Sequence, residues 1–400
     1  MKHTNSLFKM VLVCCPLWMA CTPSRQPESE AWKVHAVQGT PQEEMGIEQG
    51  ISACFAGFYQ GRLLLAGGCN FPEAPAAEGG RKRFYQGVYA AEVTGKDVLS
   101  WHQVAQLPVP AAYGVAVSTP QGLICVGGTN EEGPLSSVFR LSVQAESEQW
   151  SIDMLPSLPV TLDNMAGTCY NHCLYVAGGN VNGVPSNALY RLDLNRPESG
   201  WTRLADFPGH PRVQPVLVAQ RAKQGTFLYL WGGFAGSGAG RTATLSVDGY
   251  RYHPETDVWT SVATPTGADG VDVSLGGGTA VALDDSLILC MGGVNKTVFL
   301  DALKREERLK QASCEGDVQL EDSLKQAGRE YMLMPAEAYR FNDRILVYNT
   351  YRDGWKEVLR TPFTARAGAV LVRVGSEFYH LHGELKPGIR TSSITRISRR

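Results

Sequence analysis

The feature that most constrains the fold of this chain is a short apolar run that recurs along it and ends in a pair of glycines. A recurrence of this kind indicates an array of similar structural units. A sixth copy, FYHLHGE at 378–384, departs from the others: we align Gly383 with the first glycine and take Glu384 as the replacement of the second. The five complete copies are LLLAGG at 63–68, LICVGG at 123–128, LYVAGG at 174–179, LYLWGG at 228–233 and LILCMGG at 287–293.

Each repeat predicts one four-stranded antiparallel sheet. We interpret the run that ends in the glycine pair as the second strand. A single sheet of this size cannot bury both of its faces, but six sheets packed around an axis can. We therefore expect an all-β, six-bladed β-propeller, and an apolar fraction of 44% is sufficient for its core. A tryptophan marks the fourth strand of the first five units: Trp101, Trp150, Trp201, Trp259 and Trp355.

The two ends of the chain predict how the ring closes. After Glu384 only one strand, at 392–397, precedes the end of the chain, so the sixth sheet lacks its fourth strand. The segment AWKVHAV at 31–37 has the composition of a strand and contains a tryptophan. We expect this segment to complete the last blade, because closure of the ring removes an exposed sheet edge. The propeller is therefore assigned to residues 32–400.

Residues 1–21 are predicted to be an export signal, and residues 22–31 a polar tether. The apolar run at 10–20 follows two lysines and is too short to span a bilayer. The sequence LWMAC, which ends at Cys21, resembles a bacterial lipobox, in which the cysteine becomes the lipidated first residue. Ordinary signal cleavage is the alternative. We expect a periplasmic protein that is anchored to a bacterial membrane by a lipid on Cys21.

One segment interrupts the rhythm of the repeats. About fifty residues separate Gly293 from the next strand, which is predicted at 345–348. Within this segment, 300–309 and 320–327 combine helical spacing with high charge. We predict a helical insertion at about 300–336, and a mobile loop is the alternative.

Strand parity places the candidate binding residues on one face. Because strand direction alternates, the connections from second to third strands and those between successive sheets emerge on the same face, together with the helical insertion. A funnel of arginines and amides there suits a small polyhydroxylated acid, and a net charge of −2 argues against a nucleic-acid partner. The candidate substrate-binding residues are Arg390, Arg212, Arg366, Tyr113, Asn164 and Gln214.

Glu384 is the candidate catalytic residue. It lies in the only repeat that departs from the glycine-pair rule. A partly desolvated carboxylate at the axis end of a strand can transfer protons. The alternative is that the last repeat is merely degenerate, as terminal repeats often are.

The segment GELKPGIRT at 383–391 resembles the signature of the N-acetylneuraminate epimerases, the bacterial sialic acid mutarotases, and the repeat pattern resembles the Kelch repeat. Segments 55–68, 112–115 and 291–295 are also similar to that family. Their order differs from that of the founding members, so the chain resembles a cyclically permuted branch. The resemblance implies a six-bladed Kelch-type propeller in which Glu384 is the acid/base and Arg390 binds the substrate carboxylate.

The activity implied is the exchange of the α and β anomers of N-acetylneuraminate. A base removes the proton of the anomeric hydroxyl while an acid protonates the ring oxygen, so neither a metal nor another cofactor is expected. The alternative is a non-catalytic Kelch propeller that binds a glycan or a protein at the same face. A copper oxidase would need a Tyr/His ligand set, and the sequence shows no convincing one; a sialidase would carry Asp-box repeats, and none occurs.

Overall fold

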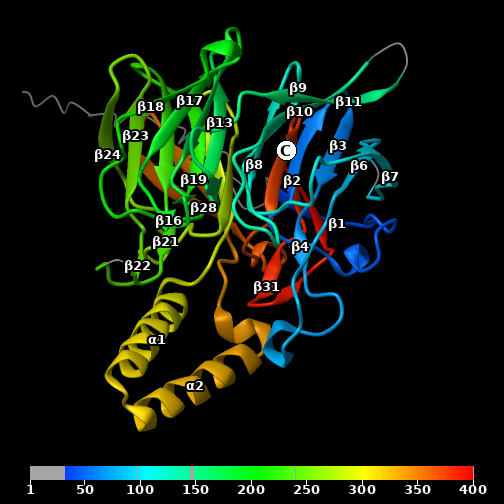
Figure 1. The fold of residues 1–400 in the computed structure, drawn as a ribbon. Coiled ribbons are helices and arrows are strands. Elements are labelled where there is room, and N and C mark those ends of the chain that lie inside the picture. The colour runs from blue at the N-terminus through cyan, green and yellow to red at the C-terminus, as the bar shows by residue number, and fades with distance from the viewer. Residues whose placement is uncertain (1–31, 96, 145–147, 239, 400) are drawn as a thin grey trace, which may run out of the picture.

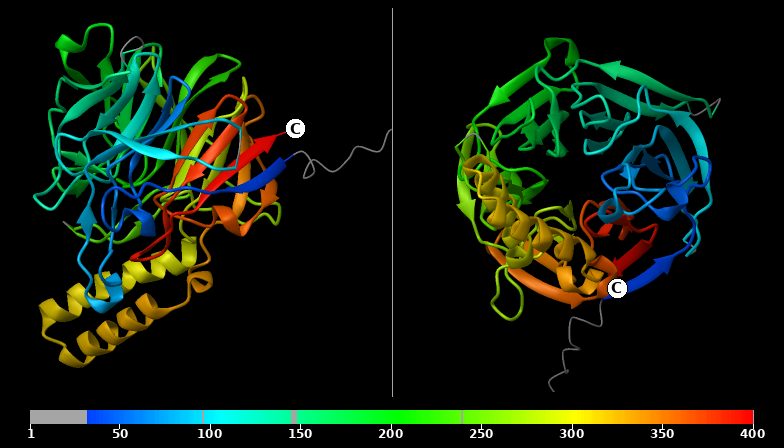
Figure 2. Two further views of the ribbon diagram at one scale, coloured as in Figure 1. Left: turned by 90° about the vertical axis from the view of Figure 1, so that its right-hand side faces the viewer. Right: turned by 60° about the horizontal axis from the view of Figure 1, so that its bottom comes forward.

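The computed structural model describes residues 32–399 apart from 96, 145–147 and 239. The predicted signal and tether at 1–31 lie outside the described residues. Six four-stranded antiparallel sheets make up most of the described chain (Figure 1). Viewed toward the helices, they form a ring (Figure 2). This is the arrangement of a β-propeller.

The six sheets follow one another along the chain. The first three are β2 (Phe55–Tyr59), β3 (Arg62–Ala66), β6 (Gly87–Glu92) and β7 (Trp101–Gln106); β8 (Val115–Thr119), β9 (Gly122–Val126), β10 (Val138–Val143) and β11 (Trp150–Leu155); and β13 (Ala166–Tyr170), β14 (Cys173–Ala177), β17 (Leu189–Asp193) and β18 (Trp201–Leu204). The others are β19 (Val216–Ala222), β20 (Gly225–Trp231), β23 (Gly249–His253) and β24 (Val258–Val262); β25 (Gly278–Ala282), β26 (Leu287–Gly292), β27 (Arg344–Asn349) and β28 (Gly354–Arg360); and β29 (Val370–Val374), β30 (Glu377–Leu381), β33 (Ile394–Arg399) and β1 (Trp32–Val37).

The core lies between neighbouring sheets, which explains why the repeated runs are apolar at every position. In β3, Leu64 packs in one cluster with Leu123 of the second sheet. Its neighbours Leu63 and Leu65 pack in another cluster with Tyr379 of the sixth sheet. A strand that is buried on both faces needs a continuous apolar run rather than an alternating one.

The predicted closure by the N-terminal strand is confirmed. β1 pairs with β33 antiparallel along its whole length, from Trp32 opposite Arg399 to Val37 opposite Ile394. The first strand of each sheet also contacts that of the next, and β29 contacts β2. The ring is therefore closed by the two ends of the described chain.

The alignment of the sixth repeat is wrong by one residue. His382, not Gly383, occupies the first glycine position: its N–H donates to Ser393 O, as the N–H of Gly67 donates to Gly87 O. Gly383 occupies the second position, and Glu384 follows the pair. The φ angle of His382 is 53°, so a histidine adopts the left-handed conformation that glycine provides elsewhere.

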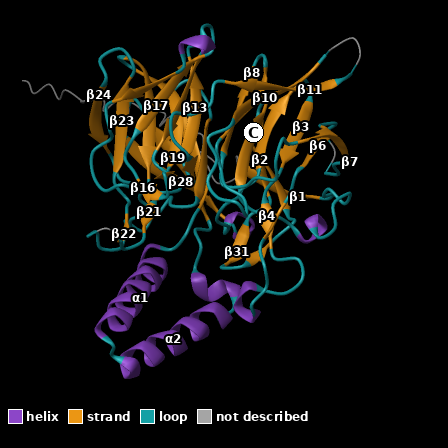
Figure 3. Ribbon diagram, viewed as in Figure 1, coloured by secondary structure: helices purple, strands orange, loops and turns teal. Residues whose placement is uncertain are grey.

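The predicted helical insertion is confirmed as two helices, α1 (Lys296–Glu315) and α2 (Val318–Leu333) (Figure 3). Asn295 caps α1, since its side chain accepts hydrogen bonds from the N–H groups of Thr297 and Val298. Short 3-10 segments occur at Ile47–Gln49, Ala76–Glu78, Pro197–Ser199, Ala336–Tyr339 and Pro362–Thr364. Neither α1 nor α2 is long and apolar enough to cross a membrane.

The connections between second and third strands lie on the face that carries α1 and α2 (Figure 1). Several of them form small ribbons that lengthen this face. The ribbons are β4 (Cys69–Asn70) with β5 (Arg83–Phe84), β15 (Asn180–Val181) with β12 (Leu162–Asp163) and β16 (Val184–Pro185), β21 (Phe234–Ala235) with β22 (Thr244–Leu245), and β31 (Glu384–Lys386) with β32 (Ile389–Arg390). The site described next lies on this face.

Candidate active site

A closed circle of backbone hydrogen bonds links the loops that enter the six inner strands. In each of six residues the N–H donates to the carbonyl oxygen of the preceding one, at 2.6 to 3.0 Å. All six have φ between 50° and 69°, and this left-handed conformation turns each loop toward its neighbour. The backbones of one Tyr, one Asn and one Gln among the predicted binding residues are thereby brought together around the axis. The members of this axial ring are Ala53, Tyr113, Asn164, Gln214, Gly277 and Gly368.

The two amide side chains of the axial ring bond to each other. Gln214 Nε2 donates to Asn164 Oδ1 at 2.7 Å, and Asn164 Nδ2 donates to Asp163 Oδ1 at 2.6 Å. Asn180 donates to the same Asp163 oxygen at 2.7 Å. This network fixes one side of the ring, whereas Gly277, Gly368 and Ala53 leave little side-chain bulk on the other side.

Glu384 and Arg390 lie opposite each other in the β31–β32 ribbon. Pro387 and Gly388 turn the ribbon, and the φ of 81° at Gly388 is one that glycine adopts readily. Glu384 Oε1 lies 2.6 Å from Arg390 Nη1 and accepts a hydrogen bond from Gly388 N–H at 2.8 Å. No donor in the described part of the chain contacts Oε2. One carboxylate oxygen is thus held by the protein and the other is available to a ligand.

Arg390 is buried but retains unused donors. Its side chain is only 4% exposed, and its guanidinium carbon lies 5.4 Å from the centre of the Phe71 ring. Nε has no hydrogen-bond partner among the described residues, and Nη1 meets Glu384 Oε1 as a close ion pair without hydrogen-bond geometry. Burial is the largest single influence and lowers the pKa of Arg390, but Glu384, Tyr113 and Cys69 together outweigh it, and the pKa is raised. Arg390 is therefore a permanent cation suited to a carboxylate.

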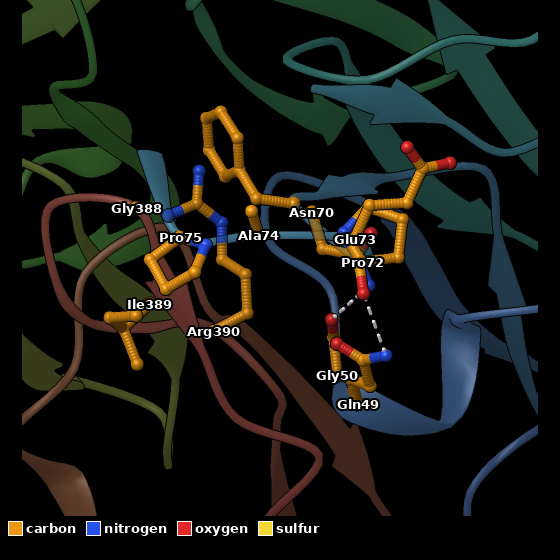
Figure 4. Close-up of a pocket in the computed structure, with 11 residues that line it drawn as sticks. Gln49, Gly50, Asn70, Pro72, Glu73, Ala74, Pro75, Gly388, Ile389 and Arg390 are labelled. Carbon is orange, nitrogen blue, oxygen red and sulfur yellow. Dashed lines mark hydrogen bonds between the residues drawn. The ribbon is translucent and has the colours of Figure 1, made fainter. Parts of the chain in front are cut away.

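A cleft of about 200 Å³ lies against Arg390. In Figure 4 the Arg390 side chain extends between the 388–390 turn and the loop 70–75, with Gln49 across the cleft. A larger hollow of about 870 Å³ is lined by Leu385, by the loop 271–274, by the start of α1 and by residues 336–344. The β31–β32 ribbon thus separates two concavities, and Glu384 and Arg390 lie on that ribbon.

Lys82 and Phe71 also lie near this site, and the sequence pattern did not predict either as a site residue. Lys82 Nζ donates to the Tyr113 hydroxyl at 3.2 Å. The same ammonium group lies 5.9 Å from the centre of the Phe71 ring, which Arg390 also contacts. The only signal was the basic run at 81–83 in an unusually long connection, and a basic run is more often a solvated surface.

The prediction that Arg212 and Arg366 line an open funnel is wrong. Arg212 is 0% exposed, and its three nitrogens bond to Asp248 and to the carbonyl oxygens of His210 and Gly232. Arg366 is 2% exposed. Both side chains point into the loops that they hold together.

Arg366 has no carboxylate partner in the described chain. It donates to His380 Nδ1, to Thr395 Oγ1 and to the carbonyl oxygens of His382 and Ser393. Burial lowers its pKa to about 10. The group therefore acts as an internal hydrogen-bond hub for the sixth sheet.

Two other carboxylates on this face, Asp269 and Asp272, are each paired with a cation, as Glu384 is with Arg390. Asp269 contacts Arg344 through both carboxylate oxygens at 2.8 Å, and the hydrogen bond from Arg344 lowers the pKa of Asp269 strongly. Asp272 Oδ2 lies 3.2 Å from Lys296 Nζ. Glu384 differs from Asp269, whose two oxygens are both bonded, whereas Asp272, like Glu384, has one oxygen that bonds to no described residue. Burial distinguishes these last two: the Glu384 side chain is 23% exposed beside a nearly buried arginine, and the Asp272 side chain is 45% exposed beside an exposed lysine.

Comparison with known proteins supports the same family as the signature segment. The chain is 31% identical to an N-acetylneuraminate epimerase of Yersinia pestis (strain Pestoides F) over 263 residues, which cover 65% of this chain and 61% of that protein. It is 29% identical to an N-acetylneuraminate epimerase of Salmonella typhi over 246 residues, which cover 60% and 57%. The matched region thus spans about three-fifths of the length of these relatives.

A solved structure, that of YjhT, is similar with a TM-score of 0.50 and 26% identity; the match covers 60% of this chain and 64% of that one. The family model for N-acetylneuraminate epimerase matches residues 22–149 and 155–399, which is most of the sequence. The chain therefore belongs to the N-acetylneuraminate epimerase family.

Proposed function

We propose that this protein is a sialic acid mutarotase, which interconverts the α and β anomers of N-acetylneuraminate by acid/base ring opening. The observation that carries the proposal is the Glu384–Arg390 pair: a carboxylate with one free oxygen beside a buried cation with unused donors. The six sheets would be the blades of a Kelch-type propeller. Family membership supports the choice of substrate.

The chemistry needs a base, an acid and a fixed substrate. In this family member, Arg390 would pair with the substrate carboxylate and hold the adjacent anomeric carbon over Glu384. Glu384 Oε2 would take the proton of the anomeric hydroxyl, and the ring would open to the keto form. Rotation of the carbonyl and closure from the other face would complete the exchange. General acid–base catalysis of this kind contributes roughly 10²- to 10⁴-fold.

Proton NMR of freshly released α-N-acetylneuraminate tests the proposal. With catalytic amounts of protein, the α signal should convert to the equilibrium mixture well before it does in buffer alone. A protein that binds the sugar but leaves this rate unchanged would be a binding propeller, and the mutarotase proposal would be abandoned.

We also propose export to the periplasm and anchorage through a lipid on Cys21, on the support of the sequence of residues 1–21. Metabolic labelling with a radioactive fatty acid tests this. The wild-type chain should be labelled and Cys21→Ala should not; an unlabelled wild-type chain would contradict the anchor.

A further inference from the structure

The proposed reaction involves two proton transfers, and Glu384 accounts for only one of them. When Glu384 removes the proton of the anomeric hydroxyl, the ring oxygen, which is bonded to the same carbon, must receive a proton as its bond to that carbon breaks. The identity of that second group rests on the proposed function. The donor of that proton must be a second hydroxyl, acid or ammonium group close to the Glu384–Arg390 pair.

Tyr113 meets this requirement because its hydroxyl has a defined orientation. Lys82 Nζ donates to Tyr113 Oη at 3.2 Å, and an ammonium group cannot accept a hydrogen bond. The phenolic proton must therefore point away from Lys82. The backbone of Tyr113 is fixed as well, because it is a member of the axial ring: its N–H donates to Ala53 O, and its carbonyl oxygen accepts from Asn164 N–H.

Lys82 is itself held in place by aromatic rings. Its ammonium nitrogen lies 4.8 Å from the centre of the Tyr113 ring, 5.9 Å from that of Phe71 and 6.0 Å from that of Phe84. Cation–π attraction at these distances favours the charged form over the ring faces. Lys82 is therefore a positioned charge rather than a freely moving surface lysine.

The Lys82–Tyr113 pair adjoins the Glu384–Arg390 pair through one aromatic side chain. The guanidinium of Arg390 lies 5.4 Å from the centre of the Phe71 ring, which Lys82 also contacts. Burial, followed by the influence of Cys69, raises the pKa of Tyr113 well above its ordinary value, and the charges of Arg390 and Glu384 also act on this hydroxyl. Tyr113 is thus protonated at neutral pH, as a proton donor must be.

We propose that Tyr113 is the second proton-transfer residue of this site and that Lys82 is its positioning residue. The two residues come from the ring that surrounds the axis and from the long β4–β5 connection, so the site is assembled from three separate stretches of chain.

Ring opening moves two protons and breaks one carbon–oxygen bond. Glu384 takes the proton from the anomeric hydroxyl, and the electron pair of that O–H bond forms the new carbonyl. The bond between the anomeric carbon and the ring oxygen breaks, its electron pair stays on the ring oxygen, and that oxygen takes the proton of Tyr113. Lys82 stabilises the phenolate. Closure on the other face returns the proton to Tyr113, and Glu384 gives its proton to the carbonyl oxygen.

The first test is Tyr113→Phe, which keeps the ring and removes the hydroxyl. We expect the enzymatic rate of anomer exchange to fall about 10²-fold with KM within about 2-fold of wild type, because the group acts in the transition state. Tyr351→Phe is the matched control, since Tyr351 is exposed in the β27–β28 turn on the opposite face. A Tyr113→Phe protein with wild-type turnover would overturn the assignment.

The second test leaves the axial ring untouched. Lys82→Met should lower turnover about 10-fold or more with little change in KM, because a charge-assisted hydrogen bond to the hydroxyl is lost. Lys82→Arg keeps a charged donor and should recover part of that loss. Lys223→Met, in the exposed β19–β20 turn, is the control. If Lys82→Met and Lys82→Arg instead raise KM and leave turnover unchanged, Lys82 binds substrate and the positioning role is overturned.

These outcomes separate the two proposals. A wild-type protein that does not accelerate anomer exchange overturns both the proposed function and this inference. An active wild type with fully active Tyr113→Phe overturns the role of Tyr113 alone. Loss of turnover in Tyr113→Phe and Lys82→Met, with both controls active, supports the assignment.

Discussion

At the scale of single residues, Glu384 and Arg390 share one ion pair but do not satisfy each other. Glu384 Oε1 is held by Arg390 and by Gly388 N–H, while Arg390 Nε lacks a partner in the described chain. A pair that existed only to stabilise the ribbon would gain from bidentate geometry. The unused oxygen and the unused donors instead suit a ligand that carries both a hydroxyl and a carboxylate.

Glu384→Gln preserves shape and removes basicity. We expect the turnover of anomer exchange to fall by roughly 10²-fold or more with little change in KM, because the amide can still accept from Arg390 but cannot take a proton. NMR-detected exchange measures both parameters. Glu255→Gln, an exposed carboxylate in the β23–β24 turn, should be unaffected. Wild-type turnover in Glu384→Gln would move the base to another residue.

Arg390→Lys replaces a planar fork by a point charge. We expect KM to rise about 10-fold or more while turnover changes less, since a lysine cannot make the paired hydrogen bonds to a carboxylate. Exchange kinetics at varied substrate concentration measure the split. Arg352→Lys, in the exposed β27–β28 turn, is the control. An unchanged KM would mean that another group binds the carboxylate.

At the scale of elements, the axial ring is built from residues in a conformation that most side chains avoid. Ala53 has φ of 55°, and a left-handed conformation is unfavourable for a residue with a Cβ by roughly 1–2 kcal/mol. We expect Ala53→Gly to raise the free energy of unfolding by about 0.5–1 kcal/mol, after the added flexibility of glycine in the unfolded chain is deducted.

Chemical denaturation measures this effect, and the same substitution elsewhere supplies a control of opposite sign. Ala327 lies in helix α2, where its backbone is right-handed. Ala327→Gly should lower the free energy of unfolding by about 1 kcal/mol. If both substitutions destabilise the protein equally, the left-handed strain at Ala53 is not released by glycine.

The sixth sheet contains two buried histidines that should make stability depend on pH. Burial first, and the charge of Arg366 second, lower the pKa of His382 to about 3, against 6.5 in the unfolded chain. The same causes lower the pKa of His380. Between these pH values the unfolded chain binds more protons than the folded one. Stability is therefore complete above pH 6.5 and decreases as the pH falls toward 3.

His382→Asn removes one of these groups and keeps a residue that tolerates the left-handed conformation. We expect the slope of unfolding free energy against pH, between pH 6 and pH 4, to decrease by up to about 1.4 kcal/mol per pH unit. Urea unfolding at several pH values measures the slope. Parallel profiles for the two proteins would show that His382 does not cause the dependence.

At the scale of the whole molecule, the ring of six sheets was predictable because the same packing requirement recurs in every sheet. Every second strand is buried on both faces, so each one repeats the same apolar run, and the close approach of the next loop selects glycine after it. A Cβ at Gly67, for example, would clash with the carbonyl oxygen of Ala111. The closing strand was predictable because the sixth unit lacked a partner that the N-terminal segment could supply.

The misaligned repeat and the buried arginines could not be predicted in the same way. The sequence LHGE allows two alignments, and only the hydrogen bonds of His382 and Gly383 distinguish them. Arg212 is buried because Asp248, 36 residues away, is brought beside it by the fold. Lys82 lies at the site because a long connection folds back over the ring. Each of these three features depends on tertiary contacts, which the local sequence pattern does not predict.

Ring closure yields a prediction for the entire molecule. β1 contributes buried residues to the cores on both sides of the sixth sheet: Trp32 packs with Leu289 and Phe378, and Val37 packs with Leu63 and Leu381. Deletion of residues 22–38 should therefore lower stability by more than the ~3–5 kcal/mol expected for an emptied tryptophan site, because it also leaves the edge of β33 unpaired. Deletion of residues 22–30 alone should leave the melting temperature unchanged.

Two further measurements test the closing strand. The melting temperature of Trp32→Ala in the full chain should lie between those of the two truncated proteins. A synthetic peptide of residues 31–38, added to the protein that lacks 22–38, should restore part of the lost stability by pairing with β33. Equal melting temperatures for the two truncations would show that the ring does not depend on its closing strand.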